Sequence, residues 1–200
     1  MTAQNLPEPA AVARRAVEVL NLIESDPDCE RLRRSALLYE SCWATHNGYV
    51  LISEWDQDTD APVLFGEALR MLCLKTAVWE LSGEDEAAAE LQMSAPVDEM
   101  VHAILAQYTL CQRMTARLGI CFVHMTDQER FGWQPGDYSE QCYTAAGWGE
   151  LNDRYWIGAQ ETNRRLAILD DRYRSVGIHS FGRSHEIDFA EENAALLLAG

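Results

Sequence analysis

Lysine is almost absent from this sequence of 200 residues: Lys75 is the only one, and the remaining basic residues are arginines. Acidic residues outnumber basic ones by 32 to 16, which gives a formal net charge of −16. Nucleic acids bind through Lys and Arg contacts to phosphate, and anionic membranes attract basic segments, so this charge argues against both as partners. It is compatible with a protein or peptide partner, and high solubility explains it equally well.

Long apolar runs and paired cysteines are also missing. No window approaches the roughly 20 apolar residues of a membrane-spanning helix, and Arg14, Arg15 and Glu18 interrupt the first apolar stretch, so no secretion signal is expected. Six cysteines are scattered without a Cys-x-x-Cys pair, which favours free buried thiols over disulfides or a cysteine zinc site. We therefore expect a cytoplasmic protein.

Helical periodicity dominates the rest of the chain. We expect one mainly α domain over 1–200, an irregular bundle of five to seven helices with a long ordered loop. Apolar spacing and stop signals such as Asn47-Gly48 and Gly119 predict helices at 8–24, 26–46, 62–81, 84–92, 97–118, 150–175 and 186–199. The helix at 62–81 is apolar around most of its circumference, which predicts a central position.

Five segments read as non-helical. Residues 1–7 look like a flexible lead, and 49–55 is either a strand or the buried start of a loop. Residues 56–60 form an acidic, solvated loop; calcium is not expected there because the EF-hand pattern needs a central Gly and a later Glu. Residues 120–124 carry β-forming side chains, and 126–149 reads as an irregular loop rich in glycine and aromatic residues.

The 126–149 loop is long enough to carry a function. Its aromatic side chains either form a binding lip or hold the loop to the core. The residues concerned are Trp133, Tyr138, Tyr143 and Trp148.

One segment has the residues for chemistry. Asp98 and His102 lie four positions apart, so on a helix their side chains can touch. A neighbouring carboxylate raises the pKa of a histidine and fixes its tautomer. His124 follows the predicted end of this helix after an extended stretch that can fold back.

Three interpretations of this segment remain open. His102 and His124 bind a transition metal such as iron or zinc, with Asp98 as a ligand or orienting group. Alternatively, His102 with Asp98 performs metal-free acid–base catalysis. In the third, Asp98 stabilises the helix start, His102 lies bonded to it at the core edge, and His124 bonds a loop. Glu99-x-x-His102 matches half of a di-iron motif, but no second copy exists.

A family resemblance rests on the same segment. The run Val97-Asp98-Glu99-Met100-Val101-His102-Ala103-Ile104-Leu105, followed by Tyr108, Cys111, Gly119 and His124, resembles the glycine-rich-domain-containing-protein-like family. It departs from that family where Val101 replaces a Trp and Met125 replaces a second His. The resemblance covers about thirty residues here and implies a helical fold without a defined reaction.

Other catalytic patterns are weak. His179 and His185 flank Ser180-Phe181-Gly182-Arg183-Ser184, which lacks the Gly-x-Ser-x-Gly elbow, so they read as turn histidines. A Cys–His pair from Cys111 or Cys121 with His124 needs an exposed thiol, and the run 120–123 looks buried.

Two functions follow from the sequence. The first is a non-catalytic accessory or peptide-binding protein that uses its acidic surface and aromatic loop. The alternative is a metal- or His-dependent helical enzyme centred on Asp98, His102 and His124, with Glu99 or Cys111 nearby.

Overall fold

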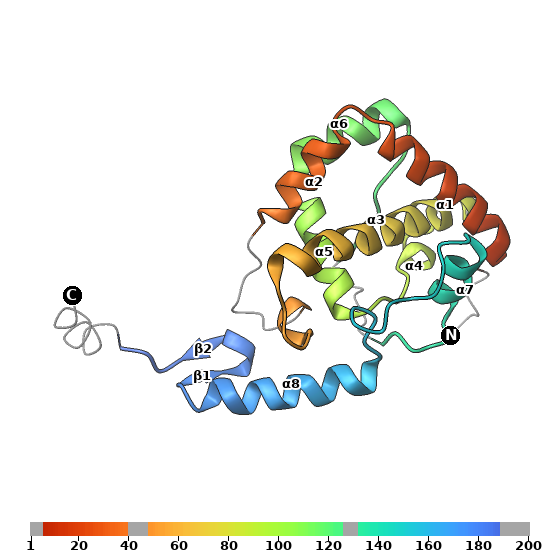
Figure 1. Cartoon of the computed structure of the whole chain (residues 1–200). Coiled ribbons are helices and arrows are strands. Elements are labelled where there is room, and N and C mark those ends of the chain that lie inside the picture. The colour runs from red at the N-terminus through yellow and green to blue at the C-terminus, as the bar shows by residue number, and fades with distance from the viewer. Residues whose placement is uncertain (1–5, 40–47, 126–131, 189–200) are drawn as a thin grey trace.

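The computed structural model describes residues 6–39, 48–125 and 132–188, and it is an irregular, mainly helical bundle (Figure 1). The longer helices are α1 (Pro9–Glu24), α2 (Cys29–Leu37), α3 (Gln57–Leu81), α5 (Ala95–Leu105), α6 (Tyr108–Leu118), α7 (Tyr138–Ala145) and α8 (Ala159–Arg174). Shorter elements are the 3₁₀ turns η2 (Gly48–Leu51) and η4 (Ser180–Gly182), the single-turn helix α4 (Glu86–Ala89), and the strands β1 (Ile178–His179) and β2 (Ser184–His185). The predicted fold class is confirmed.

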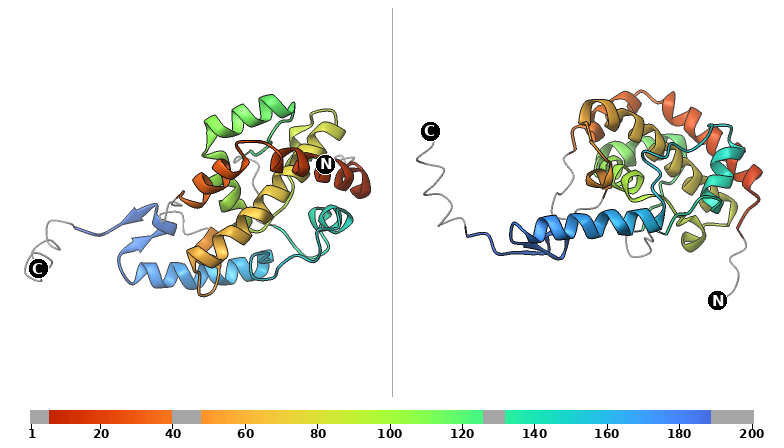
Figure 2. Two further views of the ribbon diagram at one scale, coloured as in Figure 1. Left: turned by 45° about the horizontal axis from the view of Figure 1, so that its top comes forward. Right: turned by 60° about the horizontal axis from the view of Figure 1, so that its bottom comes forward.

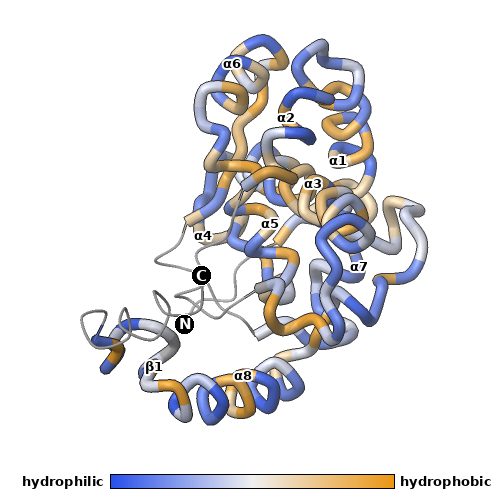
Figure 3. The backbone as a smooth tube through the Cα atoms, turned by 60° about the vertical axis from the view of Figure 1, so that its left-hand side comes forward, coloured by the Kyte–Doolittle hydropathy of each residue, from blue (hydrophilic) through white to orange (hydrophobic). Residues whose placement is uncertain are grey.

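Helix α3 is the centre of the bundle, as its all-round apolar pattern predicts. Helices α1, α2, α4, α5 and α7 all contact it, and Figure 1 shows it running through the middle of the molecule. Leu64, Leu72 and Leu74 are fully buried on different sides of the helix. Figure 3 shows apolar residues along α3. Burial of such side chains, at roughly 25 cal/mol per Å² of apolar surface, is the main stabilising term for this core.

The acidic segment 56–60 is not the solvated loop that its composition suggests; it begins α3. The Asp56 carboxylate accepts the backbone N–H of Thr59 at 3.0 Å and caps the helix. Asp60 is buried because Arg154 donates to both of its oxygens at 2.7 and 2.8 Å and the Tyr155 hydroxyl donates at 2.9 Å. Composition missed this site because its partners lie 94 and 95 residues away.

The Asp60–Arg154 contact predicts a pH-dependent stability. The hydrogen bonds from Arg154 hold the pKa of Asp60 well below its usual range. The folded state therefore resists protonation, so this stabilisation is complete above the unfolded pKa and is lost as the pH falls through the folded one. In urea titrations, the stability gap between the wild type and Asp60→Asn is expected to be constant above about pH 5 and to shrink below about pH 4. A gap that does not change with pH would contradict this assignment.

The predicted helix 97–118 is two helices. Helix α5 ends at Leu105, and α6 begins at Tyr108 after Gln107 leaves the helical conformation. The Gln107 carbonyl accepts the N–H groups of Leu110 and Cys111, which starts the new helix in a different direction. The break contains no Pro or Gly to signal it. The predicted stop is correct, since Gly119 has a φ of 65°.

The segment 126–149 is less irregular than predicted, because 138–145 form α7 against α1 and α3. The following helix also begins later than expected, at Ala159 rather than 150. Before it, Tyr155 and Trp156 donate their N–H groups to the Asn152 carbonyl in a compact turn that buries both rings. An apolar pattern that continues across a buried turn looks helical in sequence.

Other predicted boundaries shorten. Helix α2 covers nine residues of the predicted 26–46, α4 covers four of 84–92, and 48–51 form a 3₁₀ turn rather than a strand. Residues 120–124 have no regular secondary structure and belong to neither strand. Residues 1–5, 40–47, 126–131 and 189–200, with most of the predicted lead and last helix, lie outside the described residues. Within the described part of the chain, no helix is long and apolar enough to cross a membrane.

Helix α8 lies at the edge of the bundle and carries the β1–β2 hairpin beyond it (Figures 1 and 2). A small apolar cluster of Leu51, Ala95 and Ile157, separate from the main core, packs against Leu166 and Leu169 of α8. Thr162 is the one α8 side chain described as buried. The remaining faces of this helix are therefore open to solvent or only partly covered.

Candidate functional site

The structure brings together the three residues that the sequence singles out as ligands. Asp98 and His102 lie one turn apart on α5, and His124 reaches them from the segment after α6. The two imidazole rings meet at a centroid distance of 4.7 Å. One ligand atom from each of the three residues lies within 4.8 Å of the others. The convergence that the sequence suggests is present; metal binding itself stays a prediction.

The distances between donors are close to those around one ion. Asp98 Oδ2 lies 3.8 Å from His102 Nδ1, and Asp98 Oδ1 lies 3.9 Å from His124 Nε2. Donors around a tetrahedral ion with bonds of about 2.1 Å are about 3.4 Å apart. The two distances involve different oxygens of Asp98, and with one atom from each residue the donors lie within 4.8 Å of one another, so a contraction of up to about 1.4 Å would complete the triad.

Burial of the three residues is unequal. The side chains of Asp98 and His124 are 5% and 4% exposed, whereas that of His102 is 33% exposed. The site is therefore buried at Asp98 and His124 and open to solvent at His102. An edge of this kind lets water or a small molecule approach the three donors.

His124 is held in place by contacts with α3 and with the residue that follows α4. The Thr76 hydroxyl donates to the Cys121 carbonyl at 2.8 Å, and Glu90 Oε2 accepts the Met125 N–H at 3.2 Å. Lys75 Nζ lies 2.9 Å from His124 Nδ1. These contacts hold the chain on both sides of the imidazole, so the ring is positioned by the fold.

Lys75 and Glu90 form a buried ion pair directly behind His124. Lys75 Nζ donates to Glu90 Oε1 at 2.7 Å, and the two side chains are 0% and 8% exposed. A paired ammonium can only donate, so His124 Nδ1 accepts from it and the neutral ring carries its proton on Nε2. Burial, the Lys75 charge and the neighbouring His102 lower the pKa of His124 to about 3. His124 is therefore a neutral imidazole at physiological pH.

Negative charge exceeds positive charge around the site. Asp98, Glu90 and Glu99 contribute three carboxylates, with side chains 5%, 8% and 12% exposed, and Lys75 contributes one ammonium. Glu99 Oε2 also lies 3.9 Å from His102 Nδ1. The formal charge of this group is thus −2 when both histidines are neutral. A divalent cation bound among these carboxylates would offset this excess of negative charge.

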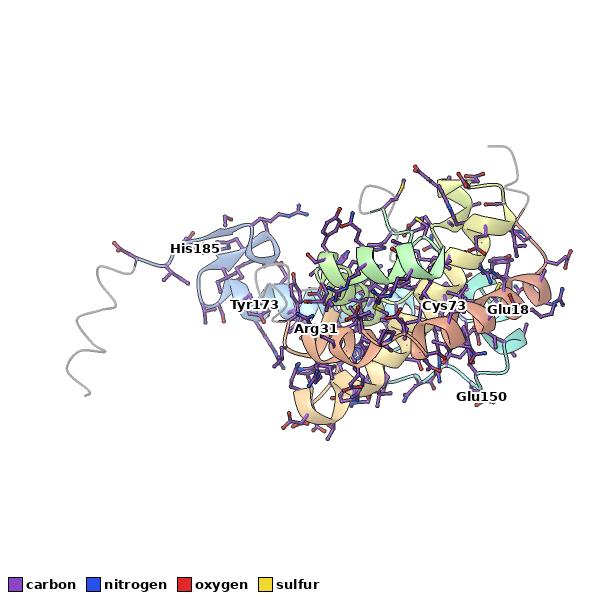
Figure 4. The ribbon with its side chains drawn as sticks, turned by 90° about the horizontal axis from the view of Figure 1, so that it is seen from above. Glu18, Arg31, Cys73, Glu150, Tyr173 and His185 are labelled. Carbon is purple, nitrogen blue, oxygen red and sulfur yellow. The ribbon has the colours of Figure 1, made fainter. Side chains whose placement is uncertain are left out.

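The thiols considered with His124 do not support nucleophilic catalysis. Cys111 is buried, its thiol donates to the Ile104 carbonyl, and burial raises its pKa to about 11. Cys121 is exposed, in contrast to the burial expected for 120–123, and burial of part of its surface together with Glu84 raises its pKa. Neither sulfur is a ready thiolate. His179 and His185 lie on the two paired strands of the hairpin rather than in the expected turn, and Figure 4 shows His185 far from the bundle.

The aromatic residues expected in a binding lip mostly pack inward. Trp133 and Tyr143 are 4% and 1% exposed, and Tyr138 and Trp148 are half-buried. Tyr143 donates to buried Glu67 at 3.0 Å and packs edge-on against Trp148. These contacts fit the alternative in which the four side chains hold their segment to the core; the exposed lip is incorrect for Trp133 and Tyr143 because the core buries them.

Two residues of the site were not recognised in the sequence. Lys75 and Glu90 lie 15 positions apart with a helix end between them, so no local spacing links them. One signal did exist: the only lysine of the chain lies inside the long helix whose sequence is apolar around most of its circumference. A lone charge at such a position must find a buried partner.

Comparison with family models, with curated proteins and with solved structures finds no match to this chain. The resemblance to the glycine-rich-domain-containing-protein-like family therefore rests on the residues around Asp98–His124 alone. The functional argument has to come from the geometry of the site.

Proposed function

We propose that this protein binds one divalent transition-metal ion through Asp98, His102 and His124 and acts as a metal-dependent helical enzyme. The observation that carries the proposal is the convergence of three donors, from two segments of the chain, to within 4.8 Å of one another. Two imidazoles and one carboxylate suit zinc and ferrous iron, which accept nitrogen and oxygen ligands together.

Charge supports a metal over protons alone. The formal charges of Asp98, Glu90, Glu99 and Lys75 sum to −2, and a divalent ion offsets that formal charge. An ion at His124 Nε2 needs the tautomer with the ring proton on Nδ1, so the Lys75 ammonium would pass a proton to Nδ1 while the Nε2 proton leaves to solvent, a net release of one proton on metal uptake. Lys75 contacts His124 Nδ1 directly and Glu90 holds Lys75, so the two residues are the outer contacts that orient the His124 ring.

The open edge at His102 supports catalysis over a purely structural ion. Structural zinc sites are closed by four protein ligands, whereas catalytic sites keep three ligands and a position for water or substrate. Three ligand residues converge in the part of the chain that the structure describes, and the side chain of one of them, His102, is 33% exposed. Activation of a bound water for hydrolysis is the chemistry that such a site supports best. The alternative, a non-catalytic accessory protein, is supported only by the acidic net charge, because the aromatic residues expected to form its binding surface are largely buried.

Metal titration of tag-free protein tests the proposal. Isothermal titration with Zn²⁺ and the absorption spectrum of bound Co²⁺ are expected to give one ion per chain. His102→Ala, His124→Ala and Asp98→Ala are each expected to weaken binding at least about 100-fold, because each removes a ligand. The matched control, His179→Ala, alters a histidine of the distant hairpin and is expected to bind like the wild type. No saturable binding, or binding that persists in the His102→Ala/His124→Ala double variant, would overturn the proposal.

A further inference from the structure

The outward face of α8 combines one exposed apolar residue with flanking charges. Ile168 is 41% exposed, and at 100° per residue Arg164 and Asp171 lie on one flank of it while Glu161 and Arg172 lie on the other. All four are within about 60° of Ile168 around the helix axis. The Arg164 side chain is 61% exposed even though it bonds its own Glu161 at 2.6 Å. Figure 3 shows this mixture of polar and apolar residues along α8.

Two side chains of opposite charge lie symmetrically about a point near the middle of α8. This point falls between Ala167 and Ile168. Arg164 precedes it by the same number of positions as Asp171 follows it. When two identical helices pair antiparallel about a two-fold axis at that point, each flank meets its own copy in reverse order. Arg164 and Asp171 share one flank, so Arg164 of each copy then lies opposite Asp171 of the other.

The α8 region is also where two copies of this acidic chain repel each other least. Residues 159–188 contain five acidic and five arginine side chains, so this region is formally neutral in a chain of charge −16. Repulsion between like-charged surfaces opposes association elsewhere on the molecule. Figure 2 shows α8 and the hairpin at the margin of the bundle, where a second molecule can approach.

We propose that α8 is a self-association surface that pairs antiparallel with α8 of a second copy, with Arg164 against Asp171 of the partner in both directions and Ile168 at the centre. A helix of 16 residues is about 24 Å long, and a single helix pair buries less than the roughly 1,200 Å² of a stable interface. The dimer is therefore weak, and it is weakened further by salt, which screens exposed ion pairs. The proposal does not depend on the metal site.

Charge reversal provides the test, with sedimentation equilibrium at low salt over a wide range of protein concentration. The wild type is expected to show reversible dimers. Arg164→Asp and Asp171→Arg are each expected to be monomeric, because each homodimer then contains two like-charge contacts. An equal mixture of the two variants is expected to regain a heterodimer, since every 164–171 contact in it again joins opposite charges. The mixture also controls for folding, because a variant that had lost its structure would not be rescued by the other.

Arg31→Asp is the matched control. It makes the same change of charge on exposed α2, which lies at the top of Figure 1 while α8 lies at the bottom, and Figure 4 labels Arg31. This variant is expected to dimerise like the wild type. A wild type that stays monomeric at every concentration, single variants that still dimerise, or a mixture that stays monomeric would each overturn the proposal.

Discussion

Glu90→Leu is expected to lower the free energy of unfolding by about 3–5 kcal/mol, one of the largest effects of any single substitution in this protein. The change leaves the ammonium of Lys75, which is 0% exposed, without its carboxylate. It also removes the acceptor of the Met125 N–H, which anchors the segment carrying His124. Urea unfolding followed by tryptophan fluorescence measures the loss.

The double variant Lys75→Met/Glu90→Leu separates the stranded charge from lost packing. Methionine and leucine fill similar volumes without a charge, so this variant is expected to recover more than half of the stability lost in Glu90→Leu. A double variant that is as unstable as the sum of the two single variants would show that Lys75 and Glu90 act independently.

The same double variant has a functional consequence under the proposed function. The Lys75 and Glu90 contacts orient His124, so removing both is expected to weaken metal binding roughly 10–100-fold while the protein stays folded. An unchanged affinity in a folded double variant would remove these residues from the site without affecting the three ligands.

Local patterns in the sequence predicted what depends on neighbours along the chain. The apolar periodicity of α1 and α3 and the Gly119 stop are local signals, and each matches the structure. The proximity of Asp98 and His102 is also local, because one helical turn separates them. In these parts of the fold, interactions between residues close in sequence determine the structure.

What the sequence could not predict depends on distant partners. Asp60 reads as a solvated carboxylate until Arg154, 94 residues later, is known to bond it. The break between α5 and α6 at Gln107 leaves the apolar pattern intact, since both helices pack on the same core. The return of His124 to Asp98 was only a hypothesis from sequence, because it needs Thr76, Lys75 and Glu90 to hold the connecting segment.

Zinc at about 1,000 times its dissociation constant is expected to raise the free energy of unfolding by about 4 kcal/mol, because an ion that binds only the folded state stabilises it by mass action. The unfolded chain lacks the geometry that joins α5 to His124. Its six cysteines can still bind zinc and reduce the shift, so Co²⁺ at matched saturation gives a second measurement. Differential scanning calorimetry with and without the ion, followed by chelation, measures the effect.

The variants determine whether this stabilisation comes from the proposed ligands. His102→Ala alters the most exposed of the three donors, so its metal-free form is expected to fold like the wild type and to lose the zinc-dependent shift. His179→Ala is expected to keep the whole shift, because its ring lies in the hairpin beyond α8. Mg²⁺ is expected to stabilise neither form, since it prefers oxygen ligands and this triad offers only one carboxylate. A zinc-dependent shift that survives in His102→Ala would assign the ion to the cysteines, and the acidic helical scaffold would then lack a metal centre at α5.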